Sequence, residues 1–179
     1  MSTLYVNNID AESGTDITIP TGKKLVVTDA GGMRVPGTII QVIETTGNTL
    51  SSVSTTTNTR VGVETSITPK ASNSKIIVLC NATCRWPHGD AGFTALHRKI
   101  GSGSWSEIKT FSRHTMYRNF DTTSINGQHC SFNYVDSPAT TDVVTYSWAM
   151  NRFGSGTAEF CPNYSSGDSQ NWTLMEIAQ

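Results

Sequence analysis

Nucleophilic hydrolysis is the first chemistry to consider, because serine is abundant and four histidines are present, His88, His97, His114 and His129. A hydrolase of this kind needs a serine or cysteine beside a histidine that an acid orients, in a recognisable local context. No Gly-x-Ser-x-Gly motif occurs. In so serine-rich a chain, a serine close to a histidine is expected by chance. The sequence therefore does not indicate a hydrolase.

Glycan cleavage by a pair of carboxylates is the second chemistry to consider. Such enzymes hold two carboxylates about 5 to 10 Å apart in a groove. The acidic residues in the second part of the chain, such as Glu107, Asp136 and Asp142, are not paired in sequence. We predict that the protein is not an enzyme and has no catalytic residues.

The four cysteines, Cys80, Cys84, Cys130 and Cys161, do not follow a metal-binding pattern. A zinc site needs closer ligand spacing and a second ligand pair, which the histidines do not supply. Cys80 and Cys84 lie on one predicted strand, about 13 Å apart and too far for a disulfide. We expect buried thiols, no metal and no cofactor. A bridge from Cys80 or Cys84 to Cys130 or Cys161 is the alternative.

Two predicted loops carry residues suited to binding. Aromatic rings stack on sugars, while neighbouring Arg, Asn, Asp and His side chains hydrogen-bond their hydroxyls. The candidate receptor-binding residues are Trp86, His88, Asp90, Arg113, Tyr117, Arg118 and Asn119. The alternative is that the aromatic side chains of the second loop cap the core or seal a contact between subunits.

Composition excludes several other classes of function. Charged residues make up 15% of the 179 residues and the formal net charge is −1, so no basic face is available for nucleic acid. No segment approaches the roughly 20 apolar residues of a membrane span. The first residues lack a positive leader and an apolar run, so we expect no secretory signal. Release by cell lysis is a route compatible with that expectation.

Alternation of apolar and polar residues predicts an all-β protein. Ile76 to Trp86, Val61 to Ile67, Val144 to Met150 and Trp172 to Ile177 all alternate with a period of two. Shorter candidate strands are 92–97, 104–109, 129–135 and 157–161. Glycine, proline and asparagine separate these segments, and no segment has apolar residues at helical spacing. Eight or nine such strands predict a β-sandwich or jelly roll.

The first 36 residues differ from the rest of the chain. Their short β-prone pieces are too thinly apolar to bury themselves alone, so they need partners, most simply copies of the same chain. We therefore divide the chain into an attachment or stalk segment, residues 1–36, and a globular head, residues 37–179. The apolar residues expected to anchor the segment or form a trimeric stalk are Leu4, Val6, Ile9, Ile17, Ile19, Leu25 and Val27.

Several short motifs of the sequence resemble motifs of fibre-like structural proteins of tailed bacteriophages, especially phages that infect cyanobacteria. The motifs are Gly22-Lys23-Lys24-Leu25, then Pro36-Gly37-Thr38-Ile39-Ile40-Gln41, which matches an entry strand of that family, and a closing Leu174-Met175-Glu176-Ile177. Similar motifs occur in the same order in that family. The resemblance spans both segments but contains no catalytic signature.

This resemblance implies a jelly-roll head, similar to those of tumour necrosis factor and complement C1q, that forms a homotrimer on a short stalk. The implied function is a tail or baseplate fibre of the virion that binds a host surface glycan or protein without catalysis. Its attachment segment would bind another virion protein. A capsid decoration or head-fibre protein is one alternative, and a bacterial carbohydrate-binding module is another.

Overall fold

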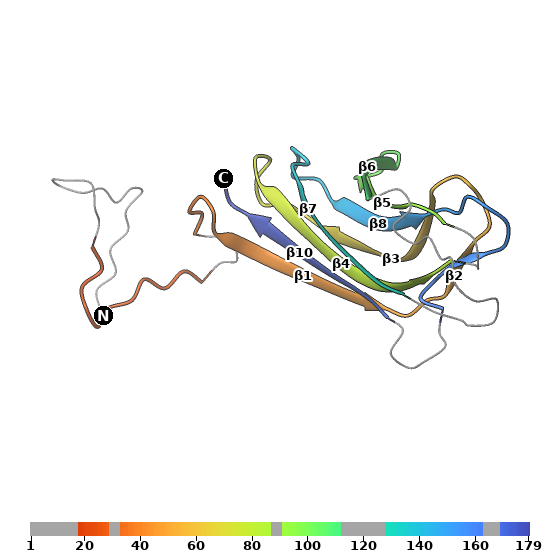
Figure 1. The fold of residues 1–179 in the computed structure, drawn as a ribbon. Coiled ribbons are helices and arrows are strands. Elements are labelled where there is room, and N and C mark those ends of the chain that lie inside the picture. Colours follow the sequence, from red (N-terminus) through yellow and green to blue (C-terminus); the bar gives the residue numbers. More distant parts are fainter. Residues whose placement is uncertain (1–17, 29–32, 87–90, 112–127, 163–168) are drawn as a thin grey trace.

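A computed structural model describes residues 18–28, 33–86, 91–111, 128–162 and 169–179. These residues form ten strands and no helix, in two antiparallel sheets packed as a sandwich (Figure 1). The six-stranded sheet contains β1 (Ile39–Gly47), β2 (Ser51–Val53), β4 (Lys75–Arg85), β7 (Gln128–Asp136), β9 (Ala158–Phe160) and β10 (Gln170–Ile177). The four-stranded sheet contains β3 (Thr59–Ile67), β5 (Thr94–Ile100), β6 (Ser106–Phe111) and β8 (Val144–Met150).

The chain passes repeatedly between the two sheets. In the six-stranded sheet β1, β10, β4 and β7 lie side by side, and in the other the order is β3, β8, β5 and β6. Strands distant in sequence are therefore neighbours in space, as in a jelly roll built from two Greek keys. The predicted all-β sandwich is confirmed.

The strands with the clearest alternation were predicted within a residue or two of their observed bounds. In β4 every second side chain from Ile76 to Cys84 is buried, and β10 buries Trp172, Leu174 and Glu176. The short β2 was not predicted, and β1 was expected only as an entry strand near its start. The sequence of β1 turns to Glu and Thr after Ile43, and even its inward-facing residues are only half-buried.

The core is centred on large aromatic side chains from both sheets. Trp148 of β8 lies 5.3 Å from Phe160 and 4.6 Å from Phe132, measured between ring centroids. Phe132 in turn contacts Trp172 edge-on at 5.9 Å. Such tilted and edge-on arrangements are the favourable geometries for aromatic pairs. They hold the two sheets together along the middle of the sandwich.

Gln170 joins the two sheets where the ladder between β3 and β8 is irregular. The register shifts between Val61 and Thr65, which leaves the backbone of Val63 outside regular pairing. The buried Gln170 side chain accepts a hydrogen bond from Val63 N at 2.8 Å and donates one to Val63 O at 3.2 Å. Without these hydrogen bonds, the N–H and the carbonyl of Val63 would each be buried without a partner, at a cost of about 1–3 kcal/mol per group.

Gly62→Ala is expected to lower the free energy of unfolding by about 2–4 kcal/mol. Gly62 has a φ of +70°, and an added Cβ would overlap the Gln170 amide and the Phe160 ring. Gly101→Ala is the matched control, because Gly101 has a φ of +52° and an added Cβ there meets no atom within 4 Å. Urea unfolding followed by tryptophan fluorescence measures both variants. Equal losses would show that backbone strain alone, without the overlap, determines the effect.

Candidate functional site

Of the predicted receptor-binding residues, only Trp86 is among the described residues. Its side chain is buried, and its indole nitrogen donates a hydrogen bond to the Asn151 carbonyl at 2.8 Å. The Trp86 ring therefore closes one end of the core and presents no face on which a sugar could stack. His88, Asp90, Arg113, Tyr117, Arg118 and Asn119 lie outside the described residues, and their proposed role remains a prediction.

The predicted attachment segment is described in part. Ile19, Leu25 and Val27 are exposed, with Leu25 at 66%, while Leu4, Val6, Ile9 and Ile17 lie outside the described residues. Residues 18–28 pair with no strand and lie apart from the sandwich (Figure 1). Among the described residues, the first strand is β1, which begins at Ile39. The domain boundary near residue 36 remains a prediction.

The outer face of the six-stranded sheet carries an apolar row that crosses four strands. Val42 of β1 is paired with Met175 of β10, Met175 with Ile77 of β4, and Ile77 with Val135 of β7. Val42 and Val135 are 49% and 54% exposed. Neighbouring strands are about 4.8 Å apart, so the row is about 14 Å long. Ile39, Leu79 and Ile177 extend it on either side.

This face becomes polar farther along the same strands. Thr46, Asn171 and Asn81 are paired across three strands, and their side chains are linked by hydrogen bonds of 3.0 and 3.2 Å. Beyond them, Arg85 and Glu159 form an ion pair at 2.7 Å. The apolar row therefore occupies one half of the face and a satisfied polar network the other.

The outer face of the four-stranded sheet is polar. Arg60 and Glu64 of β3, His97 and Lys99 of β5 and Glu107 of β6 lie on it. The small side chains of β8 on this face are buried beside these longer neighbours, so β8 is buried on both faces, although its sequence predicted one buried face. A charged face is already compatible with water, which makes the other sheet the better candidate for a protein contact.

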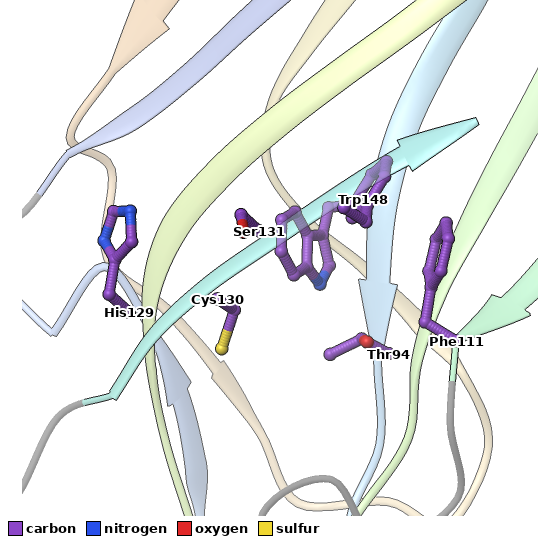
Figure 2. A pocket seen from close by; sticks show the side chains of 7 residues that line it. Thr94, Phe111, His129, Cys130, Ser131 and Trp148 are labelled. Atoms are coloured by element: carbon purple, nitrogen blue, oxygen red, sulfur yellow. The ribbon is translucent and has the colours of Figure 1, made fainter. Parts of the chain in front are cut away.

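A cavity of about 270 Å³ lies at the edge of the sandwich, where β7 faces β5, β6 and β8 (Figure 2). Its described lining residues are Thr94, Phe111, His129, Cys130, Ser131, Phe132 and Trp148. Phe111 and Phe132 stack at 4.2 Å with an interplanar angle of 18°, bridging the two sheets. No local sequence pattern indicated this cavity, because its walls come from four strands that only the tertiary fold brings together.

Burial determines the chemistry of the cysteines. All four are buried thiols, as expected, and Cys84 and Cys130 lie on the same face of adjacent strands. Burial raises the pKa of Cys80 and of Cys84 well above the ordinary value, so both are protonated at neutral pH. A protonated thiol is a poor nucleophile and a poor metal ligand, which favours a packing role for these two residues.

Among the described residues, no cluster of three or more His, Cys, Asp or Glu side chains could hold a metal ion. Within the same ranges, no helix is long and apolar enough to cross a membrane.

No protein-family model matches the chain, and no curated protein sequence matches it. Among solved structures, the VP2 subviral particle of infectious bursal disease virus overlaps 77% of this chain at 12% identity, with a TM-score of 0.43. A structure of the Gt strain of the same virus overlaps 90% at 14% identity, with a TM-score of 0.41. The chain spans only 33% and 47% of those two proteins. Superpositions this loose establish neither a family nor a function.

Proposed function

We propose that the chain is a non-enzymatic structural protein of a bacteriophage particle, a trimeric tail or baseplate fibre whose head binds the host surface. The observation that carries this proposal is the apolar row Val42–Met175–Ile77–Val135 on an exposed sheet face. Exposed apolar rows in a sheet invite association. A closed ring of identical chains covers such a row on every subunit without leaving an open end.

Three copies are the number that the phage-fibre resemblance implies, and the exposed segment before β1 supports the same assembly. Ile19, Leu25, Val26 and Val27 are 44–73% exposed, so this segment also needs a partner. In the proposed particle the segment forms the stalk and binds another virion protein. In the same proposal, the loops of the head bind the host surface.

The proposed host-binding residues can be tested by the double substitution Tyr117→Ala and Arg118→Ala. The purified chain is expected to compete with intact particles for adsorption to host cells, and the variant to compete at least tenfold less well. The variant should keep the mass of the parent in light scattering, which separates a lost contact from lost assembly. If the variant keeps the parental mass and competes as well as the parent, this loop does not bind the host.

Labelling of particles with an antibody against the chain tests where it resides. The proposal expects label at the tail or baseplate. Label spread over the capsid would instead establish a decoration or head-fibre protein, and particles without label would exclude a virion component.

A further inference from the structure

We propose that the cavity between β7 and β5, β6 and β8 binds a small neutral ring compound that carries one carbonyl-type hydrogen-bond acceptor. This goes beyond the proposed fibre function, which needs no such ligand. Three features of the cavity lead to this class of compound: its size, its aromatic walls and one unsatisfied donor.

The unsatisfied donor is the indole N–H of Trp148. The Trp148 side chain is 1% exposed, and its Nε1 is buried without a hydrogen-bond partner. Figure 2 shows the nitrogen-bearing edge of the indole turned toward the space between Cys130 and Thr94. An unpaired buried donor costs about 1–3 kcal/mol, so an acceptor that reaches it gains more than it would in water. The side chains of Cys130 and Thr94 line this space.

The walls select a flat and uncharged molecule. Phe111 and Phe132 stack face to face, and Phe132 also packs against Trp148 at 4.6 Å. A ring compound entering beside them continues this aromatic stacking. No described lining residue carries a permanent charge, and the side chain of His129 lies on the exposed face of β7. A charged ligand would lose its hydration without an opposite charge in return.

The volume limits the ligand to about one ring. Engineered apolar cavities of about 150 Å³ accept benzene in other proteins, and natural ligand pockets begin near 300 Å³. At about 270 Å³ the cavity accommodates roughly ten non-hydrogen atoms. Fragments of this size bind with dissociation constants of about 1 mM.

Acetophenone and α-methylstyrene form a suitable pair of probes, because they have nearly the same shape and only the ketone has a carbonyl acceptor. The chain has four tryptophans. In a ¹⁵N-tryptophan-labelled sample the indole signal that is absent from Trp148→Phe is expected to move downfield and saturate with acetophenone. α-Methylstyrene should bind about five- to tenfold more weakly, the loss expected for one hydrogen bond, and leave that signal without the downfield shift.

Trp172 provides an internal control. Its Nε1 is also buried without a partner, but Trp172 does not line the cavity. Its indole signal, identified from Trp172→Phe, should therefore not show a hydrogen-bond shift. Absence of a saturable shift at Trp148, or equal shifts at Trp148 and Trp172, would overturn the proposal, as would equal affinity for the two probes.

A pair of leucine substitutions tests the location by a second route. Cys130→Leu adds side-chain volume to the cavity wall and should weaken acetophenone binding at least fivefold. Thr110→Leu, on the face of β6 opposite Phe111 and exposed, should leave it unchanged. Well-dispersed tryptophan signals show that each variant is folded. Unchanged binding by folded Cys130→Leu would exclude this cavity as the site.

Discussion

Val135→Glu is expected to dissociate the proposed trimer into monomers. Val135 ends the apolar row on the outer face of the six-stranded sheet and is 54% exposed within one subunit, so the substitution costs a single chain little. In a threefold assembly the change occurs three times, and each carboxylate would be buried without a partner. Light scattering at micromolar concentration should report about 19.4 kDa in place of three times that mass.

Val143→Glu is the matched control for this prediction. Val143 is 45% exposed, but it precedes β8 in the four-stranded sheet and lies outside the apolar row. It should leave the trimer intact. If the unsubstituted protein is itself a monomer, the proposal of a trimeric head is wrong and a carbohydrate-binding module becomes the favoured function. Removal of residues 1–36 then shows which part of the chain holds the trimer together. Loss of the trimer would indicate the stalk, and a trimer that persists would indicate the sheet face.

The sequence predicted the strands well where burial on one face is strict. The side chains of β4 and β10 alternate between core and surface along their whole length, so a period of two was visible without the structure. β1 was underestimated because its inner face carries Thr45 and Gly47 and is covered only partly. β2 has three residues, too few to show any period.

The surfaces could be predicted only in part, for a physical reason. Ile77 and Leu79 are apolar residues on the outer face of β4, but the row exists only because Met175 and Val135 are in register with Ile77. Register between strands far apart in the sequence cannot be read from the local sequence of either strand. Trp86 shows another limit of sequence reasoning: its position next to polar loop residues suggested a binding site, whereas its burial and the use of its N–H within the core became visible only in the structure.

Asp136 is the second residue whose substitution is expected to have a large effect, here on the free energy of unfolding. It is 4% exposed at the end of β7, and both of its oxygens bond Arg98 Nη1, at 2.7 and 2.9 Å. It also accepts a hydrogen bond from the Tyr146 hydroxyl at 2.7 Å. Burial and the adjacent carboxylate raise the pKa of Tyr146, so the hydroxyl remains protonated and keeps donating. Because Arg98 and Tyr146 belong to the opposite sheet, Asp136 ties the two layers together.

Asp136→Ala is therefore expected to lower the free energy of unfolding by about 3–5 kcal/mol, since it leaves a partly buried guanidinium and a buried hydroxyl without their acceptor. Tyr146→Phe, which removes one hydrogen bond, should cost about 1–2 kcal/mol. Urea unfolding followed by tryptophan fluorescence measures both variants against Glu64→Ala, which breaks an exposed pair with Arg60 at 4.0 Å and should cost under about 0.5 kcal/mol.

Replacing both charged partners distinguishes an unpaired charge from a lost attraction. If the unpaired guanidinium causes most of the loss, Arg98→Met combined with Asp136→Leu should recover a large part of the stability that Asp136→Ala removes. If the double variant is instead as unstable as the sum of its single changes, Asp136 contributes mainly through direct attraction across the two sheets. A loss from Asp136→Ala no larger than that from Glu64→Ala would show that Asp136 contributes little to holding the two sheets together.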